Sequence, residues 1–463
     1  MTPLFPHQQA TLDWLIHRGG SGAIFWDPGT GKTRFCLEAF TQLRIKIPTL
    51  RLFVVAPLSI VEPVWKEETL KYTAYTWTSI KQLNPKADIW CGNFESVIRT
   101  TMQRRLETAG LWRTPVMLII DESSRCKNYR SLTTKTLLAL AERCQFRLCC
   151  SGTPMPNGMH EAWAQIRIVD PGIFPRSYFI WRRTYFYLGR NGHSIAEPPP
   201  SRQGLADLFK QGWEWKQTSE KRTQLLMQIA PVTSWIKKRD CLSLPERITT
   251  IRHVELSVEE RRAYEQMRRK LVVEFQEETI TAEIALVKLM RLRQLASGFL
   301  YGDITHRIGT SRLNVLLETL DELGEQPVII WAHFHEEIEQ IAEALGERAV
   351  TFYAKTLDRA ESLRRFGTEC RYLIAHPRSA GHGLTLTQAS TCLWYSLDWS
   401  LEAYSQANDR IHRIGQQRSC LYVHLIAPGL IDEDIWAVLQ RKRTLQEAID
   451  RVLGGRVQLN EPL

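Results

Sequence analysis

Short apolar runs rich in β-branched and aromatic residues alternate with longer amphipathic stretches along this chain. The runs fall into two series, separated by a region with a different pattern. The first series is Ala23–Trp26, Leu52–Ala56, Met117–Ile120 and Arg147–Cys150, and the second is Val328–Trp331, Tyr372–Ala375, Thr391–Tyr395 and Leu421–Ile426. Strands that alternate with helices favour parallel sheets with crossover helices. Two series therefore predict an α/β chain with two parallel-sheet lobes in tandem.

The region between the two series reads as helical insertions. Residues 176–202 are aromatic and basic and then proline-rich, which indicates an insertion with a loop. From Val258 to Ser297 apolar residues recur at three- and four-residue spacing, and a closing helix is expected from Asp432 to about Val452. We therefore divide the chain into a first lobe (1–170), an insertion and linker (171–245), a helical protrusion (246–305) and a second lobe (306–463).

Composition is compatible with this picture. At roughly 150 residues per domain, 463 residues correspond to about three units. Hydrophobic residues make up 44% and charged residues 24%, which is ordinary for a soluble globular protein. Lys and Arg exceed Asp and Glu by 60 to 50. This modest basic excess fits a polyanionic partner, but many soluble proteins without one are equally basic.

Other compositional signals exclude several classes of protein. The ten Cys residues contain no C-x-x-C pair, and the twelve His residues show no metal-ligand spacing, so we expect reduced, buried thiols and no zinc site. The first residues lack the pattern of a signal peptide, and no apolar run approaches the roughly 18 residues needed to span a bilayer. We expect a cytoplasmic protein, in a bacterial cell or a phage-infected host, with no membrane partner.

A glycine-rich loop follows the first predicted strand and precedes a predicted helix. Glycines allow the tight turn that aims backbone N–H groups at phosphate oxygens, and the helix N-terminus adds a positive dipole end. The Lys should reach the β- and γ-phosphates of ATP, and the Thr hydroxyl should bind Mg²⁺. The strict pattern of such loops is missed because Trp occupies position 26 where a Gly is expected. The predicted phosphate-binding residues are Asp27, Pro28, Gly29, Thr30, Gly31, Lys32 and Thr33.

Two carboxylates end the predicted strand at Met117–Ile120. Ligands bind at the carboxyl edge of such parallel sheets, which is where this strand delivers Asp121 and Glu122. Asp121 is expected to hold the Mg²⁺, and Glu122 to orient or deprotonate the attacking water. An Asp-Glu pair alone is common on surfaces, but after a buried strand and downstream of Lys32 it predicts the second half of a nucleotide site.

In their order along the chain, several strings resemble the motifs of the SWI/SNF-related ATPases of helicase superfamily two. In the first lobe these are residues 4–8 (LFPHQ), 55–59 with 65–67, 121–124 with 127–128, and 151–154 with Asn157 and Glu161. In the remainder they are residues 292–294, 379–387, 398–399 and 406–416. The last string, QANDRIHRIGQ, and the S-G-T-P at 151–154 are the most specific. The compact chain is most similar to the annealing-helicase branch.

The resemblance implies two RecA-like lobes and assigns further roles. Gln8 would contact adenine, Gly381 and Gln406 would contact nucleotide, and Arg410 and Arg413 would stabilise the transition state. Placed three apart on an expected helix, the two Arg would share one face, although a solvated basic face has the same spacing. Their delivery from the second lobe would make hydrolysis depend on closure of the lobes. Position 124 departs from the family, where His links the γ-phosphate to the S-G-T-P motif; here it is Ser124, from which we expect altered coupling.

Expected DNA contacts come from the same motifs and from the insertion. The motif residues would offer backbone amides and small hydroxyls to phosphates, which position a strand without reading its sequence. In residues 176–190, Arg side chains are interleaved with aromatic ones, which suits nucleic acid but equally suits an aromatic helix packed on the first lobe. The expected contacts are Pro57, Ser59, Ser151, Thr153, Gly383, Thr385, Arg182 and Arg183.

The sequence thus predicts a monomeric, DNA-stimulated ATPase that uses ATP and Mg²⁺ and translocates on duplex DNA, with branched or forked DNA and a targeting protein as further partners. Three alternatives stay open: a strand-separating helicase, an ATP-gated DNA clamp or regulator with weak hydrolysis, and a motor that acts on a DNA-bound protein such as RNA polymerase. The pathway served is not specified by the sequence.

Overall fold

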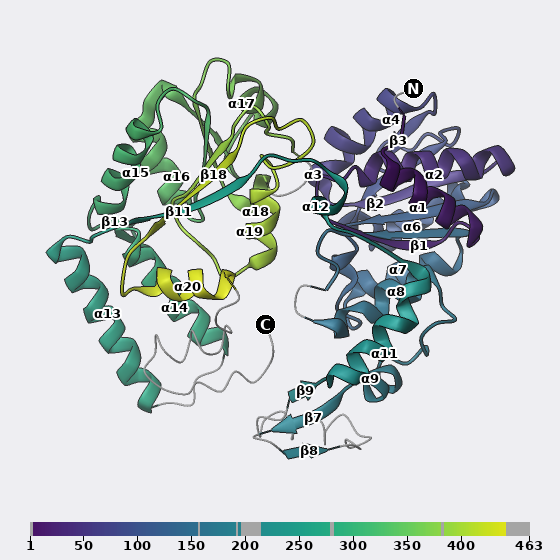
Figure 1. Cartoon of the computed structure of the whole chain (residues 1–463), viewed down its shortest axis with the longest axis horizontal. Coiled ribbons are helices and arrows are strands. Elements are labelled where there is room, and N and C mark those ends of the chain that lie inside the picture. The colour runs from purple at the N-terminus through teal and green to yellow at the C-terminus, as the bar shows by residue number, and fades with distance from the viewer. Residues whose placement is uncertain are drawn as a thin grey trace. The chain divides into compact units, whose positions relative to one another are not determined.

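A computed structural model describes residues 3–155, 158–190, 193–195, 214–277, 282–380 and 384–440. It divides near residues 243 and 244 into two compact units, each built on its own parallel sheet. Both sheets and their helices can be followed in Figure 1. Among the helices of the described ranges, none combines the length and apolar character needed to cross a membrane.

The sheet of unit 1 has seven strands in the order β10-β1-β6-β5-β2-β4-β3, and every neighbouring pair is parallel. All four strands predicted in the first series are confirmed. Three short or partly polar strands were not predicted, and one of them, β10, is separated from the rest by the insertion. The strands are β1 Gly22–Trp26, β2 Arg51–Ala56, β3 Trp77–Ser79, β4 Ile89–Asn93, β5 Val116–Asp121, β6 Phe146–Cys150 and β10 Thr233–Ile236.

Helices cover both faces of this sheet. Because successive side chains of a strand point to opposite faces, Ile24 and Trp26 of β1 enter one core and Ala23 and Phe25 enter the other. The first face carries α1 Pro6–His17, α2 Lys32–Lys46, α3 Leu58–Ile60, the π-helical turn η1 Val61–Lys66 and α4 Glu67–Tyr72. The second carries α5 Phe94–Val97, α6 Thr100–Thr108, η2 Leu111–Arg113, α7 Leu132–Glu142 and α8 Ala162–Val169.

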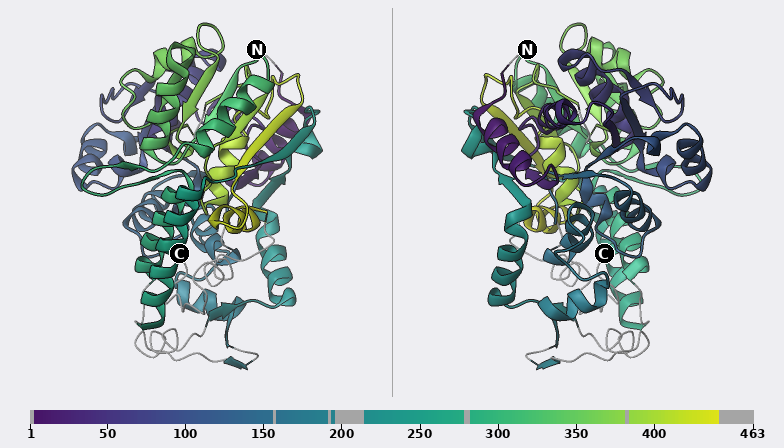
Figure 2. Two further views of the ribbon diagram at one scale, coloured as in Figure 1. Left: turned by 90° about the vertical axis from the view of Figure 1, so that its left-hand side faces the viewer. Right: turned by 90° about the vertical axis from the view of Figure 1, so that its right-hand side faces the viewer.

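The aromatic insertion extends the second core. Side chains of α9 (Tyr178–Tyr185) and α11 (Ser219–Ile229) join that cluster. Beyond them a small antiparallel sheet, β8-β7-β9, lies apart from the seven-stranded sheet (Figures 1 and 2). Its strands are β7 Tyr187–Arg190, β8 His193–Ile195 and β9 Glu214–Lys216, and the chain then passes through η5 Ala230–Val232, β10 and α12 Lys238–Cys241.

The sheet of unit 2 has six parallel strands in the order β11-β18-β17-β14-β16-β15. All four strands of the second series are confirmed. The strands are β11 Arg247–His253, β14 Val328–Trp331, β15 Ala349–Phe352, β16 Tyr372–Ala375, β17 Thr391–Trp394 and β18 Cys420–Ile426. The helices are α15 Ser311–Glu322, α16 His335–Leu345, α17 Arg359–Arg365, α18 Pro377–Ala380, α19 Leu401–Asn408 and α20 Ile431–Leu439, with a two-stranded ribbon of β12 Phe299–Leu300 and β13 His306–Arg307.

The long helical pattern predicted from Val258 to Ser297 forms two helices, α13 Val258–Glu277 and α14 Ala282–Ala296. The closing helix begins as expected in α20, whereas residues 441–452 of that prediction lie outside the described residues. A buried Arg joins these pieces of unit 2. Arg312 of α15 is 1% exposed, donates to the carbonyl oxygens of Ala296, Tyr395 and Leu425, and pairs with the carboxylate of Asp432 in α20.

Candidate functional site

The predicted phosphate loop connects β1 to α2 and is held in a tight turn. Gly29 and Gly31 have φ values of 81° and 83°, which an L-residue with a side chain rarely adopts. The Thr30 hydroxyl donates to Asp27 O at 2.8 Å, and Lys32 Nζ donates to Trp26 O at 2.8 Å and to Asp27 O at 3.2 Å. The loop therefore folds its one Lys back onto its own carbonyl oxygens, and this Lys is the first residue of α2. Thr33 is the second residue of that helix.

Gln8, expected to contact adenine, supports this loop from α1. It is 1% exposed; its Nε2 donates to Gly31 O at 3.0 Å, and its Oε1 accepts from Phe5 N at 2.9 Å. A Cβ on Gly31 would approach Gln8 Nε2 to 2.4 Å and displace the Gln8 amide, and the φ of 83° also favours glycine there. His7 adds a contact to Thr30 O at 3.0 Å. The Gln8 amide thus holds the loop with its nitrogen and the N-terminus of α1 with its oxygen, and its contact with adenine stays a prediction.

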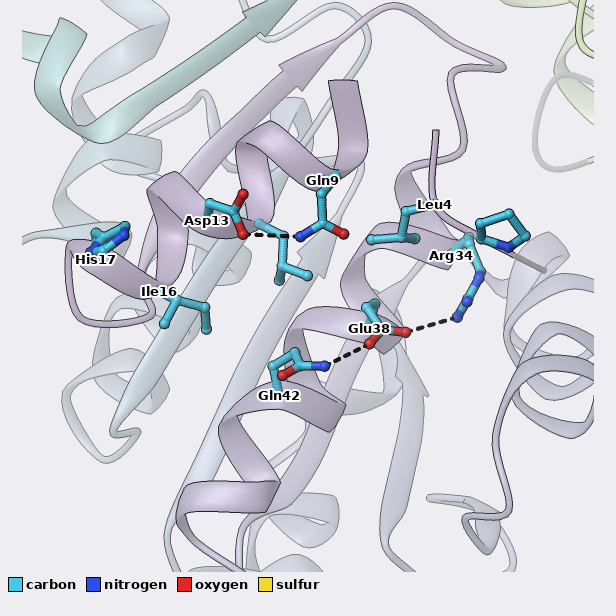
Figure 3. Close-up of a pocket in the computed structure, with 10 residues that line it drawn as sticks. Leu4, Gln9, Asp13, Ile16, His17, Arg34, Glu38 and Gln42 are labelled. Atoms are coloured by element: carbon cyan, nitrogen blue, oxygen red, sulfur yellow. Dashed lines mark hydrogen bonds and ion pairs between the residues drawn. The ribbon is translucent and has the colours of Figure 1, made fainter. Parts of the chain in front are cut away.

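A pocket of about 470 Å³ lies beside the loop, between α1 and α2. Figure 3 shows Gln9 bonded to Asp13 on α1, and Arg34, Glu38 and Gln42 in a row along α2. Leu12 and Ile16 supply part of its apolar wall. Arg34, which lines the pocket, directly follows Thr33, the last residue of the phosphate loop, so one end of the pocket is next to that loop in the sequence.

Asp121, at the end of β5, is a buried carboxylate held by neutral donors. Trp65 Nε1 donates to its Oδ2 at 3.0 Å and Glu122 N to its Oδ1 at 3.1 Å. Burial raises the pKa of Asp121 above its ordinary value, although the charge of Lys32 and the Trp65 bond oppose that rise. Such a carboxylate gains from a cation nearby. Within the described residues no group of three or more His, Cys, Asp or Glu could hold a metal. A single buried carboxylate next to a phosphate loop fits Mg²⁺, which combines one or two carboxylates with phosphate oxygens and water.

Glu122 has a φ of 58°, the one positive φ of a residue other than Gly in the described chain. Residues in this region of backbone space cost on the order of 1–3 kcal/mol and gather at active sites. Asp121 is the last residue of β5, and Glu122 directly precedes η3 Ser123–Cys126. The turn at Glu122 therefore separates the two carboxylates. This separation is compatible with the different tasks predicted for the two residues, which are Mg²⁺ binding for Asp121 and activation of the attacking water for Glu122.

The S-G-T-P loop follows β6 and contacts the phosphate loop. A Cβ on Gly152 would lie 2.7 Å from ring atoms of Pro28, so the two loops touch at these positions. Ser151 N donates to Ile24 O of β1 at 3.1 Å, and Thr153 N donates to Ser151 Oγ at 3.2 Å. The hydroxyl of Thr153 is buried with no hydrogen-bond partner among the described residues. Asn157 lies outside the described residues.

Pro57 and Ser59 lie where β2 enters α3, at the carboxyl edge of the same sheet. The π-helical turn η1 follows directly and carries Trp65 to Asp121. Single π turns are often found at functional sites. Four predicted parts of unit 1, namely the phosphate loop, the Asp-Glu pair, residues 57–59 and the S-G-T-P loop, therefore share one sheet edge, at the ends of β1, β5, β2 and β6.

The insertion helix α9 favours the packing interpretation for most of its aromatic side chains. Tyr178, Trp181 and Tyr185 are buried in the second core of unit 1. Arg182 is partly buried: it donates to the Tyr178 hydroxyl at 2.6 Å and lies 5.0 Å from the Trp215 ring centroid. Arg183 is exposed on the same helix. Contact of Arg182 and Arg183 with nucleic acid stays a prediction, and the exposed Arg183 is the better placed of the two.

In unit 2 the predicted catalytic Arg residues follow α19 instead of lying on it. The expectation of a shared helical face was wrong, because α19 ends at Asn408 and residues 409–415 form turns. The carbonyl of Arg410 accepts from Leu386 N at 3.1 Å, and the Arg410 Nε donates to Gln406 O at 2.7 Å. With these two bonds the chain turns away at Arg410 instead of continuing the helix. Arg413 lies in the same turn segment, which His412 anchors through Pro245 O at 2.9 Å.

The 379–387 string meets this turn segment directly. Besides the Leu386 bond, Gln416 Nε2 donates to Ala389 O at 2.8 Å and to Ile411 O at 3.2 Å. Gln406 is 5% exposed within α19, and Thr385 is exposed. Gly381 and Gly383, expected to contact nucleotide and nucleic acid, lie outside the described residues.

Three residues of the unit 1 site were not assigned a role from the sequence. Trp65 and Ser123 were noted only as parts of family strings, and Gln165 was not singled out. Ser123 Oγ donates to Gln165 Oε1 at 2.6 Å, and Gln165 Nε2 donates to Pro154 O at 2.6 Å. No spacing rule indicates such partners, because the segments after β5 and β6 and the helix α8 meet only in the tertiary fold.

Comparison with known families matches most of this chain. The family model described as the SNF2-related domain matches residues 7–297, and the helicase conserved C-terminal domain matches residues 311–415. These two ranges contain the predicted nucleotide and DNA-contacting residues of both units.

Individual proteins are similar along the full chain. "Putative protein p41" of Acyrthosiphon pisum secondary endosymbiont phage 1 is 25% identical, over 96% of this chain and 97% of that protein. The SWI/SNF-related matrix-associated actin-dependent regulator of chromatin subfamily A-like protein 1 of Xenopus laevis is 25% identical over 95% of this chain, which spans 43% of that protein. The putative ATP-dependent helicase/translocase YwqA of Bacillus subtilis is 26% identical over 96% of this chain and 48% of its own length.

A solved structure, the Sulfolobus solfataricus SWI2/SNF2 ATPase core in complex with dsDNA, covers 100% of this chain and 95% of that chain, with 21% identity and a TM-score of 0.43. The chain thus spans nearly all of the phage relative and less than half of the Xenopus and Bacillus relatives.

Proposed function

The chain belongs to the SNF2-related family of helicase superfamily two ATPases, and from that premise we propose that it couples ATP hydrolysis to translocation on duplex DNA. The observation that carries the proposal is the convergence, at one sheet edge of unit 1, of Lys32 in its glycine turn, the buried Asp121 and the S-G-T-P loop. Movement on DNA is the inference drawn from family membership and from the net charge of +10.

In this proposal the loop from Asp27 to Thr33 holds the phosphates. Lys32 Nζ, now bonded to two loop carbonyls, exchanges them for phosphate oxygens, which are stronger acceptors because they are charged. Thr33 and Asp121 would hold Mg²⁺, which would neutralise charge on the phosphates. Gln8 fixes Gly31 and thereby keeps the loop open to the nucleotide.

Hydrolysis then requires a positioned water and compensation of the charge that grows on the γ-phosphate. Glu122 accepts a hydrogen bond or a proton from the water. Arg410 and Arg413 supply positive charge from unit 2, which makes turnover depend on closure of the two units and links it to a mechanical step. A correctly placed Arg is worth about 10³–10⁵ in rate in related phosphoryl transfers.

Lys32→Ala tests the nucleotide assignment. We expect the variant to fold and to lose ATP turnover by a factor on the order of 10²–10³, since one charge-stabilising donor is removed. Lys46→Ala is the matched control, because Lys46 is an exposed Lys in the last turn of the same helix. Normal turnover in Lys32→Ala would refute the assignment.

A panel of nucleic acids tests the track. We expect duplex DNA to raise the ATPase rate of the wild-type chain, and we expect displacement of a triplex-forming strand without unwinding of a fork. Unwinding of the fork would support a strand-separating helicase. A slow rate that DNA does not change would support an ATP-gated clamp, and stimulation by RNA alone would exclude a DNA motor.

A further inference from the structure

One buried side chain joins two segments of unit 1 that have different tasks in the proposed function. Residues 121–124 end β5 and carry the carboxylates, whereas residues 151–154 follow β6 and are expected to face the nucleic acid. Gln165 of α8 lies between them and is 0% exposed. Its position makes it the candidate for a physical connection between ATP and the track.

The hydrogen bonds of Gln165 fix its orientation. Nε2 donates to Pro154 O at 2.6 Å and to Glu161 O, one turn earlier in the chain, at 3.2 Å. Because a carbonyl can only accept, the amide nitrogen must lie on this side, and Oε1 is left to accept from Ser123 Oγ at 2.6 Å. Ser123 is also 0% exposed, so water does not compete for these bonds.

The S-G-T-P loop is held on its other side by the nucleotide-binding segment. Gly152 rests against Pro28 of the phosphate loop, and Ser151 N is bonded to Ile24 O of β1. A change of the loop is therefore constrained by two anchors, one from the phosphate loop and one from the Ser123–Gln165 pair. Such a chain of buried, fully used bonds is the kind of network that can carry coupling between sites.

The neighbouring Ser124 offers a contrast. It occupies the position where the family resemblance expects a His that links the γ-phosphate to the S-G-T-P motif. Ser124 is buried, at 2% exposure, and its carbonyl accepts from Lys127 N within η3. The bridge to Pro154 is instead made by the hydroxyl one residue earlier.

We propose that Ser123 and Gln165 are positioning residues that couple the state of the nucleotide site to the S-G-T-P loop, in place of a residue at position 124. This inference rests on the proposed function. The Ser123 hydroxyl moves with the end of β5, and Gln165 passes the displacement to Pro154 O and so to the loop that contacts DNA.

The first test compares ATP turnover with and without saturating duplex DNA. Gln165→Met keeps the length of the side chain and removes both polar ends; Ser123→Ala removes one hydroxyl and is the milder variant. We expect both to keep basal turnover close to wild type and to lose DNA stimulation by roughly 2- to 30-fold, the range that single residues in coupling networks produce. Ser124→Ala, a buried serine one position away, should keep full stimulation.

A purely structural role would give a different result, with basal and stimulated rates falling together and the thermal midpoint falling with them. A Gln165→Met variant with wild-type stimulation would overturn the proposal, as would loss of stimulation in Ser124→Ala of the same size. Wild-type protein that DNA does not stimulate would contradict the proposed function instead.

Hydrogen exchange supplies a second test that needs no DNA. The Mg²⁺ complex of a non-hydrolysable ATP analogue should slow exchange in peptides covering residues 27–36 and 151–155 of the wild type. In Gln165→Met and Ser123→Ala we expect protection of the first peptide to persist and protection of the second to be lost. Persistence of both would overturn the coupling role, and absence of both in the wild type would overturn nucleotide binding itself.

Discussion

Two buried carboxylates, Asp432 in unit 2 and Asp121 in unit 1, are satisfied in opposite ways. Asp432 of unit 2 is 4% exposed and pairs with Arg312, whose guanidinium also donates to three carbonyls. Asp121 of unit 1 is 8% exposed and, among the described residues, receives only the Trp65 and Glu122 N–H groups, with Lys32 as the nearby charge. The first carboxylate is complete within the protein, whereas the second is left to be completed by a cation.

The ion pair of Asp432 indicates a structural role for that carboxylate, whereas the neutral donors around Asp121 indicate a functional one. A buried ion pair fixes the elements that it joins, and removing one partner leaves an uncompensated charge. A buried carboxylate that is not paired with a cation lowers the stability of the fold. Such groups are typical of binding and catalytic sites. The comparison therefore predicts opposite responses to substitution in the two units.

Removal of the Arg partner should have the largest effect on stability. We expect Arg312→Met to destabilise unit 2 by about 3–5 kcal/mol, because Asp432 stays buried without its charge partner. Hydrogen exchange of peptides from α15 and α20 measures the loss, with α2 of unit 1 as an internal reference. Arg312→Met combined with Asp432→Leu should recover part of the loss, because the unpaired charge is removed. Recovery should be incomplete, because three carbonyls still lack their donor. Exchange in α20 unchanged from wild type would contradict the structural role.

Asp121→Asn should show the reverse pattern. We expect ATP turnover to fall by a factor on the order of 10²–10³, as for other groups that stabilise charge in a transition state. The thermal stability of unit 1 should change little, because removal of a desolvated charge offsets the loss of one hydrogen bond: the Asn amide keeps an oxygen for only one of the two N–H donors. A large drop in stability with turnover retained would place Asp121 in the same class as Asp432.

Loss of the Trp65 donor should produce a smaller effect at the same site. A hydrogen bond to a charged group contributes about 1.5–3 kcal/mol, so Trp65→Phe should reduce kcat/KM by at least about tenfold while the ring still fills its place. Trp77→Phe is the matched control, because Trp77 Nε1 donates to Cys91 Sγ away from the site. Equal rates in the two variants would show that Trp65 only packs.

The residues of the candidate site differ in how far the sequence could predict their positions and roles. Asp121 and Lys32 were identified because a buried strand and a glycine turn leave few other roles for them, and all eight predicted strands were found. Trp65 and Gln165 could not be assigned from local patterns. Trp65 lies 56 residues from Asp121 and Gln165 lies 11 residues from Pro154, and only the tertiary fold brings each pair together. Arg410 and Arg413 were placed on a helix because spacing alone cannot show that Leu386 N captures the Arg410 carbonyl. Local patterns thus predicted elements and their chemistry, and failed where tertiary hydrogen bonds decide.

The smallest effect expected is a shift in pH dependence at Asp121. Burial raises the pKa of its carboxyl above the ordinary 3.8, so without Mg²⁺ its contribution to stability is present below that value and is lost as the pH rises through the raised pKa. Catalysis has the opposite sign, because the ionised form is needed and turnover should fall as the pH drops through the same pKa. Mg²⁺ competes with the proton, so a higher Mg²⁺ concentration should move the acid limb of the ATPase profile to lower pH.

Trp65→Phe removes a bond that lowers this pKa and should move the limb to higher pH at fixed Mg²⁺. Profiles of kcat/KM at several Mg²⁺ concentrations, for wild type, Trp65→Phe and Trp77→Phe, measure both shifts. An acid limb that neither Mg²⁺ nor Trp65→Phe displaces would mean that Asp121, like Asp432, is already satisfied within the protein.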